Sequence, residues 1–129
     1  MNKVIYNLCR GIAALIMLQT LFFKFSAAPE SVYIFSKVGI EPWGRYFTGV
    51  MELIASVLLF TPGYTWAGAL LGAGLMAGAL LSHLTILGIE VMGDGGYLFF
   101  LGLTVLICCS VVLYYQKKAI PFVKQFVTK

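Results

Sequence analysis

Three ionisable residues, Lys24, Glu52 and His83, stand within or at the end of long apolar stretches of the sequence. A charged side chain inside a lipid bilayer is costly, so such a residue usually faces a cavity or a partner. A glutamate and a histidine at one depth can share a proton or hydrogen-bond a ligand carbonyl, and a nearby lysine can neutralise the carboxylate. The pattern predicts a polar pocket with Glu52 and His83 as candidate catalytic residues.

The depths of these residues agree. Glu52 and His83 each lie six residues inside the same edge of their apolar stretches, which is about 9 Å at the rise of a helix. Lys24 ends the first stretch on that side, and Glu90 follows the stretch that carries His83. We therefore expect the ligand-binding residues to be Lys24, Glu52, His83 and Glu90.

Each residue also has a purely structural interpretation. The long stem of Lys24 allows its ammonium group to reach the membrane surface. His83 can bond a backbone carbonyl of a neighbouring helix. Glu52 is the hardest to explain by structure alone, because burying its charge is expensive.

The composition says which kind of chain carries these residues. Of the 129 residues, 60% are hydrophobic and 11% are charged, and the mean hydropathy is +0.94, whereas a typical soluble domain is about 25% charged. These values exclude a water-soluble globular domain and a disordered chain. The net charge of +4 is scattered, so it offers no stripe for nucleic acid.

The length then limits the architecture. A membrane-spanning helix uses about 20 residues, so one membrane domain over residues 1–129 has room for four spans. We expect an all-α integral membrane protein, an antiparallel four-helix transmembrane bundle with a long outer loop after the first helix. The expected spans are 4–25, 42–60, 64–89 and 97–115.

Two segments outside the spans have recognisable patterns. Residues 29–38 of the outer loop, with Tyr33 and Val38 among the apolar positions, predict a short helix that Gly39 ends. It would act as a lid or as an ordinary interfacial connector. The tail, residues 116–129, mixes lysines with phenylalanine and valine, which is typical of a segment lying on anionic lipid.

Basic residues indicate the orientation. Six lie on the side of the two termini and three on the other, namely Lys3, Arg10, Lys117, Lys118, Lys124 and Lys129 against Lys24, Lys37 and Arg45. This predicts a multi-pass protein of the bacterial cytoplasmic (inner) membrane with both termini in the cytoplasm. Ser26-Ala27-Ala28 resembles a signal-peptide cleavage site, but Pro29 follows it and the apolar stretch is long, so we expect no cleavage.

The remaining patterns concern packing. Gly68/Gly72 and Gly74/Gly78 are spaced four apart in the third stretch, which favours close helix packing inside the bundle or a homodimer face. The cysteines, Cys9, Cys108 and Cys109, lie within apolar stretches without a C-x-x-C pair, so we expect apolar filler. Histidine, cysteine and acidic residues show no metal-site spacing. We expect neither a metal nor an intrinsic cofactor.

Several segments resemble the DoxX / DoxX-like family of small bacterial four-span membrane proteins. The resemblance runs from about Arg10 to Tyr115 and rests on R-G-I-A-A-L, F-F-K-F, V-G-I-E-P-W, T-G-V-M-E-L-I-A-S-V-L-L-F and A-G-A-L-L-S-H-L-T. It matches the family's lysine, glutamate and histidine to Lys24, Glu52 and His83. Family members include a subunit of a thiosulfate:quinone oxidoreductase and methylamine-utilisation accessory proteins, so the resemblance implies a link to membrane redox systems.

Three functions remain open at this stage. The first is a quinone- or redox-associated membrane subunit, in which a protein partner carries the electrons and Glu52 and His83 handle protons. The second is a non-enzymatic lipid-binding or accessory subunit that assembles a membrane complex. The third is a small proton-coupled exporter, suggested only by the general link between intramembrane carboxylates and proton relays. Whether the chain is itself an enzyme stays open, and its ligand is a quinone or another lipophilic small molecule.

Overall fold

The computed structural model describes residues 3–116, and every regular element within them is helical. The elements are α1 (Lys3–Phe25), α2 (Pro29–Val38), α3 (Trp43–Leu59), α4 (Thr65–Ser82), the π-helical turn η1 (His83–Leu87) and α5 (Tyr97–Tyr115). The all-helical class expected from the sequence is confirmed. The basic tail expected over 116–129 lies, apart from Gln116, outside the described residues.

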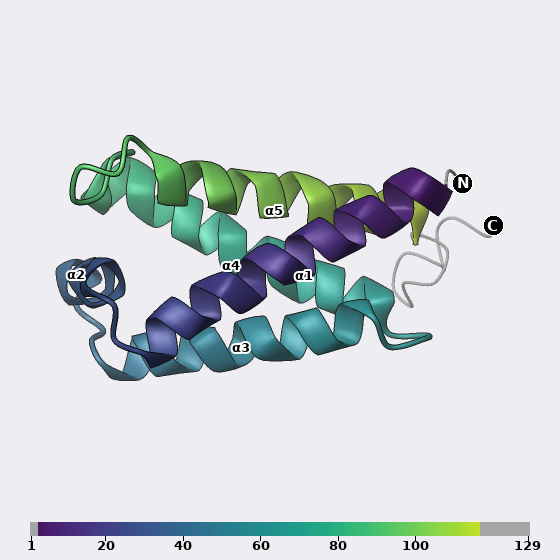
Figure 1. The fold of residues 1–129 in the computed structure, drawn as a ribbon, viewed down its shortest axis with the longest axis horizontal. Helices are drawn as coiled ribbons and strands as arrows, with labels where there is room; N and C mark the ends of the chain where they lie inside the picture. The colour runs from purple at the N-terminus through teal and green to yellow at the C-terminus, as the bar shows by residue number, and fades with distance from the viewer. Residues whose placement is uncertain (1–2, 117–129) are drawn as a thin grey trace.

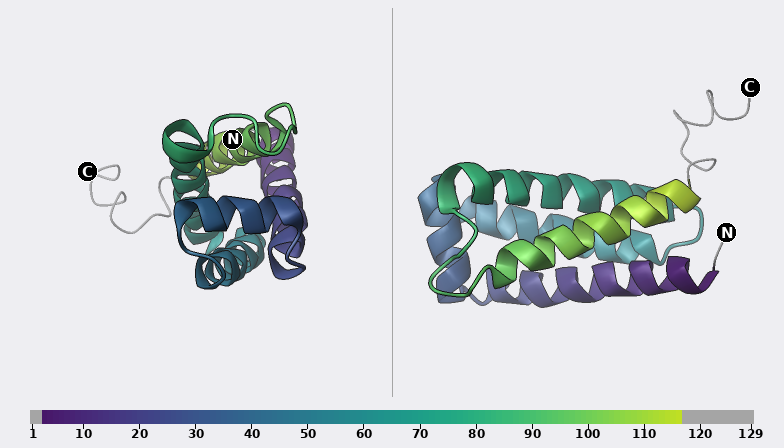
Figure 2. Two further views of the ribbon diagram at one scale, coloured as in Figure 1. Left: turned by 90° about the vertical axis from the view of Figure 1, so that its left-hand side faces the viewer. Right: turned by 90° about the horizontal axis from the view of Figure 1, so that it is seen from above.

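The four longer helices run alongside one another, and consecutive ones point in opposite directions (Figure 1). Helix α1 packs between α3 and α5, and α4 packs between the same two helices on the other side. Both α1 and α4 slope relative to α3 and α5 (Figure 1). At the end where α2 lies, α1 is near α3 and α4 is near α5, and at the opposite end the pairing is reversed (Figure 1). Helix α2 lies across one end of this arrangement (Figure 2).

Three segments within residues 3–116 are long and apolar enough to cross a membrane, by length and composition: Lys3–Phe25, Thr65–Leu87 and Tyr97–Tyr115. Many large apolar side chains point outward, among them Leu15 at 69% exposure, Phe22 at 65% and Leu84 at 66%. A lipid environment accounts for such a surface, whereas water would not. Helix α3 coincides with the expected span 42–60, but its 17 residues make it shorter than the three segments above.

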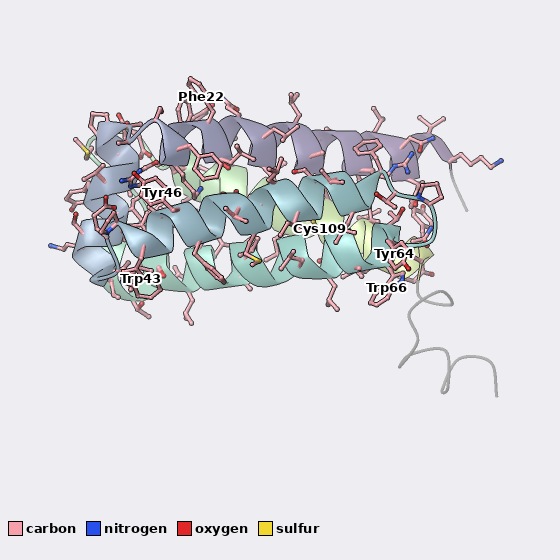
Figure 3. All side chains as sticks on the ribbon, turned by 90° about the horizontal axis from the view of Figure 1, so that it is seen from below. Phe22, Trp43, Tyr46, Tyr64, Trp66 and Cys109 are labelled. Carbon is pink, nitrogen blue, oxygen red and sulfur yellow. The ribbon has the colours of Figure 1, made fainter. Side chains whose placement is uncertain are left out.

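Aromatic residues mark the two ends of the bundle. Figure 3 shows Trp43 and Tyr46 at the end where α2 lies, and Tyr64 and Trp66 at the opposite end. Tryptophan and tyrosine favour the membrane–water interface because a polar group is attached to an apolar ring. The arrangement suits a bundle whose long axis runs across the bilayer.

The short helix expected over 29–38 is present as α2. Pro29 occupies its first turn, where a missing N–H is tolerated. Gly39 ends it in the left-handed region at φ +92°, and its N–H donates to the carbonyls of Phe35 (3.0 Å) and Ser36 (3.1 Å). The buried face consists of Ser31 and Phe35, while Tyr33, expected among the apolar residues, is exposed.

The half of the bundle away from α2 is closely packed. A Cβ added to Gly68 would lie 2.6 Å from the backbone nitrogen of Leu59, and one added to Gly72 would lie 3.0 Å from Cys109 Sγ. Met17 and Cys109 are fully buried in this core. Gly68 and Gly72 therefore serve packing within the chain, which was one of the two expectations for the glycine pattern.

Candidate ligand-binding cavity

A cavity of about 380 Å³ lies between the helices at the α2 end of the bundle. Its walls are mostly apolar and come from α1, α2, α3, α4, η1 and α5. Volumes of this order hold drug-sized ligands, and the usual site of this kind has a few placed polar groups in an apolar lining. The polar side chains here are Thr20, Lys24, Ser31, Thr48, Glu52, Ser82 and His83.

The first polar group of the cavity joins α1 to α3. Lys24 Nζ lies 2.7 Å from Glu52 Oε1, and the hydroxyl of Thr20 donates to Glu52 Oε2 at 2.7 Å. The Glu52 side chain is 0% exposed. Thr20 and Lys24 are one helical turn apart, so both reach the same carboxylate from one face of α1. The ion pair and the hydrogen bond offset the cost of burying the charge.

A buried arginine holds the end of α1 in place. Arg45, at the start of α3, is 4% exposed and pairs with the carboxylate of Glu41 through Nε (2.9 Å) and Nη2 (2.8 Å). Its Nη1 donates to the backbone carbonyl of Lys24, in the last turn of α1, where the carbonyl otherwise accepts only a long bond of 3.4 Å from the N–H of Ala27. Arg45 therefore fixes the turn from which the Lys24 side chain extends.

The second polar group is His83, where α4 becomes the π-helical turn η1. Its Nδ1 lies 3.0 Å from the carbonyl oxygen of Gly88, and its ring packs edge-on against Phe99, with centroids 5.6 Å apart. Because a carbonyl can only accept, Nδ1 carries the hydrogen and the neutral ring keeps a lone pair on Nε2. No partner for Nε2 occurs within residues 3–116. His83 thus offers the cavity a free acceptor, which becomes a donor on protonation.

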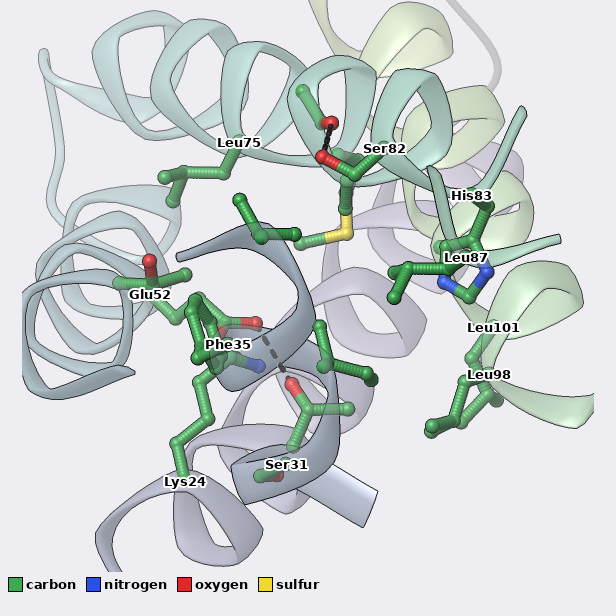
Figure 4. Close-up of a pocket in the computed structure, with 18 of the residues that line it drawn as sticks. Lys24, Ser31, Phe35, Glu52, Leu75, Ser82, His83, Leu87, Leu98 and Leu101 are labelled. Atoms are coloured by element: carbon green, nitrogen blue, oxygen red, sulfur yellow. Dashed lines mark hydrogen bonds and ion pairs between the residues drawn. The ribbon is translucent and has the colours of Figure 1, made fainter. Parts of the chain in front are cut away.

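The two groups occupy different walls of the cavity. Figure 4 shows Lys24 and Glu52 on one side and His83, with Leu87, on the other. The apolar side chains of Phe35 and Leu75 lie near Glu52, and that of Leu87 lies beside His83 (Figure 4). Lys24 and Glu52 cancel in charge, and the other described lining residues carry no formal charge when His83 is neutral. The site suits a neutral molecule with a polar group at each end.

Three of the four expected site residues, Lys24, Glu52 and His83, line this one cavity. The fourth, Glu90, is exposed in the loop after η1 and is not among the lining residues. The chain turns at Gly88, where φ is +81° and ψ is 169°, and Glu90 lies beyond that turn.

Sequence reasoning missed several polar residues, among them Thr20, Ser31 and Arg45. Thr20 and Ser31 look like ordinary small polar residues in the sequence, and only the structure shows that they line the cavity. Arg45 was counted as an interfacial charge, but it is buried. A possible signal was the pair Glu41 and Arg45, four residues apart, which is the spacing of a helical ion pair.

Within residues 3–116, no three histidine, cysteine or acidic side chains lie close enough together to hold a metal ion. The three cysteines form no disulfide with one another, and Cys108 and Cys109 are buried in the packed half of the bundle. The polar contacts described in the cavity are hydrogen bonds and one ion pair.

The family follows from comparison with known proteins. The model of the DoxX-like family matches residues 8–111, which covers most of the chain and includes Lys24, Glu52 and His83. The chain belongs to the DoxX-like family. No curated protein and no solved structure gave a significant match. Membership in this family agrees with the apolar helices in describing a membrane protein.

Proposed function

We propose that this DoxX-like protein binds a neutral, lipid-soluble carbonyl compound in its cavity, a quinone first among them, as a subunit associated with a membrane redox system. The observation that carries the proposal is the placement of two separate polar groups, Lys24–Glu52 and His83, on different walls of one apolar cavity. A quinone has two carbonyl oxygens on opposite sides of an apolar ring, so it matches this arrangement of groups.

The chemistry divides between the two walls. The Lys24 ammonium group is a donor for one carbonyl, and a protonated His83 is a donor for the other. Reduction of a quinone to a quinol takes up two electrons and two protons. In this proposal Glu52 and His83 pass protons, Lys24 balances the Glu52 charge, and a partner protein supplies the electrons.

The proposed topology has four spans. Helix α3, with 17 residues, is about 26 Å long at helical rise, slightly shorter than a hydrocarbon core of about 30 Å. It packs between α1 and α4, each part of a segment long enough to cross. We propose that all four cross the inner membrane with both termini in the cytoplasm, as the basic residues indicate. The cavity then opens in the outer half of the bilayer.

Quinone titration tests the proposal. A short-chain ubiquinone or menaquinone analogue is titrated into the purified protein in nanodiscs by calorimetry. We expect saturable binding that His83→Ala and Glu52→Gln each weaken by about tenfold or more, since a hydrogen bond to a charged group contributes about 1.5–3 kcal/mol. Glu90→Gln is the matched control, because Glu90 does not line the cavity.

Two outcomes would count against the quinone proposal. One is an absence of binding, and the other is binding that the cavity variants leave unchanged. If phospholipid co-purifies and occupies the cavity instead, the second function, a non-enzymatic lipid-binding accessory subunit, becomes the better one. The apolar lining of the cavity favours that alternative as well.

A further inference from the structure

The cavity reaches the side of the molecule beside two glycines of α4. Gly74 and Gly78 line the cavity and are also exposed. A Cβ added to either would meet no heavy atom within 4 Å. A residue that both lines a cavity and faces outward lies at its opening, so the cavity is open at these two positions.

The opening lies between α4 and α3. Gly68 contacts the backbone of α3, and Leu75 and Ser82, which line the cavity, follow it at steps of seven residues on the same face of α4, with Gly78 at the edge of that face. The two helices are close at Gly68 and separate toward the α2 end (Figure 1). Thr48 lines the cavity on the α3 side.

The aqueous end of the cavity is covered in a different way. Helix α2 lies across it (Figure 2), and Phe35 and Ser31 on its buried face are 9% and 8% exposed. Both residues line the cavity. A solute arriving from water would have to displace α2, whereas a molecule in the bilayer meets the gap at Gly74 and Gly78.

Two polar groups inside the cavity have no partner in the described part of the chain and are available to a ligand that enters through the opening. His83 is 4% exposed and its Nε2 has no hydrogen-bond partner within residues 3–116. The hydroxyl of Ser31 also has none in that part of the chain, although Ser31 is buried. Both residues line the cavity, so these polar atoms are available to bond a ligand or water there.

We propose that the ligand enters sideways from the bilayer, between α3 and α4, and that its apolar tail stays in the gap beside Gly74 and Gly78 while its polar head lies between Lys24–Glu52 and His83. The ligand is then an amphiphile with a hydrogen-bonding head and a chain of lipid length. This inference rests on the proposed function in taking the cavity as a ligand site, but its test needs no bound ligand.

Thiol labelling in nanodiscs distinguishes the two routes. Ala79→Cys places a thiol in the cavity wall, and the unsubstituted chain gives the background from Cys9, Cys108 and Cys109. One reagent is a maleimide on a fatty-acyl chain, and the other is a charged, water-soluble methanethiosulfonate. Peptide mass spectrometry reports the labelled position and its rate.

We expect the acyl maleimide to label Ala79→Cys and the charged reagent to label it far more slowly. Adding Gly78→Phe should slow labelling by the acyl maleimide about tenfold, which corresponds to an activation free energy raised by about 1.4 kcal/mol. Gly11→Phe is the matched control, because Gly11 also has open space around a Cβ but lies away from the cavity on α1. Gly74→Leu is a second blocking variant if Gly78→Phe does not fold.

Three results would overturn the sideways route: equal labelling by both reagents, no labelling by either, or a rate of acyl labelling that neither blocking variant changes. Its failure differs from that of the proposed function. Labelling as expected with no quinone binding would leave the route standing and remove the quinone. Quinone binding with labelling from water would keep the quinone and remove the route.

Discussion

The two halves of the bundle are built from the same four long helices, yet one is filled and the other is hollow. In the far half, Gly68 and Gly72 bring α4 against α3 and against Met17 and Cys109. In the half under α2, Gly74 and Gly78 have no heavy atom within 4 Å of an added Cβ. The same residue type at the same spacing thus closes one interface and opens another, because Gly74 follows Gly72 by only two residues, about 200° around the helix, and so faces another side of α4.

The polar groups follow the same division. The hollow half holds a buried ion pair, a histidine and several hydroxyl groups. The core of the filled half consists of apolar side chains, and the buried polar residues beside it, Ser56 and Thr65, carry only hydroxyl groups. Each half also has an arginine whose Nη1 donates to a carbonyl at the end of a helix, Arg45 to Lys24 and Arg10 to Leu59 at 3.4 Å. Within residues 3–116, Arg45 has a carboxylate partner and Arg10 has none.

The largest effect expected is from breaking the ion pair in the hollow half. Lys24→Met leaves the fully buried Glu52 carboxylate without its cation, which should destabilise the fold by about 3–5 kcal/mol. The double variant Lys24→Met/Glu52→Gln should recover most of that loss. Unfolding in mixed micelles, followed by circular dichroism, measures both. Equal stability of the single variant and the parent would show that Glu52 is not charged in the fold.

The next effect compares the two arginines. Arg45→Met removes four contacts to carboxylate or carbonyl oxygens and leaves Glu41 unpaired, so we expect a loss of about 1.5–3 kcal/mol. Arg10→Met removes a longer contact to Leu59 and one to Asn7, for about 0.5–1.5 kcal/mol.

The same unfolding assay ranks these two variants. Arg45→Met should also weaken ligand binding, because it releases the turn that carries Lys24. Arg10→Met, at the other end, should leave ligand binding unchanged. If Arg10→Met were the more destabilising variant, the polar contacts of the two arginines would not explain how the two ends of the bundle are stabilised.

A third comparison uses the glycines themselves. Gly68→Ala forces a Cβ to within 2.7 Å of backbone atoms of α3, and overpacking of this kind costs about 1–3 kcal/mol. Gly78→Ala meets open space and should be neutral or slightly stabilising. Thermal unfolding of the two variants side by side gives the contrast. Equal losses at Gly68 and Gly78 would remove the distinction between a closed and an open interface.

The sequence predicted the helices better than it predicted their crossings. The range 97–115 coincides with α5, and the short helix over 29–38 with its end at Gly39 is α2. Helical rise and the spacing of apolar residues are local properties, so they can be read from the chain. The grouping of Lys24, Glu52 and His83 was predicted only from their similar depth in the membrane, which can be counted along each expected span.

The sequence could not show how the side chains of different helices meet. The slope of α4 and the neighbours that Gly68 and Gly78 meet depend on the packing of all four helices. The burial of Arg45 depends on how the loop after α2 positions the start of α3. Glu90 was expected in the site because it lies near His83 in sequence, but a turn at Gly88 lies between them.

The smallest effect expected concerns the loop that leads from η1 to α5. Partial burial would raise the pKa of the Asp94 carboxyl, but backbone N–H groups of Val91, Gly96 and Leu98 bond its carboxylate and hold the pKa below the ordinary value of 3.8. A carboxyl with a lowered pKa in the fold stabilises it at pH values above 3.8 and loses that contribution as the pH falls further. Leu98 lies in the first turn of α5, whose N-cap residue is Gly96, so the Asp94 carboxylate also satisfies an N–H that the start of that helix leaves free, as a capping side chain does.

Asp94→Ala should therefore cost about 1 kcal/mol at neutral pH, the usual effect of losing a helix cap. The difference from the parent should shrink below pH 3.8, because the parent carboxylate becomes protonated there. Melting curves of the two proteins from pH 6 to about pH 3, the range that spans an ordinary aspartate pKa, measure this. A difference that stays constant over the range would assign the effect to packing rather than to charge. The loop with Asp94 lies beside the hollow half. The turn between α3 and α4, residues 60–64, carries no ionisable side chain except Tyr64. Substitutions in that turn should therefore change stability by the same amount at pH 6 and at about pH 3.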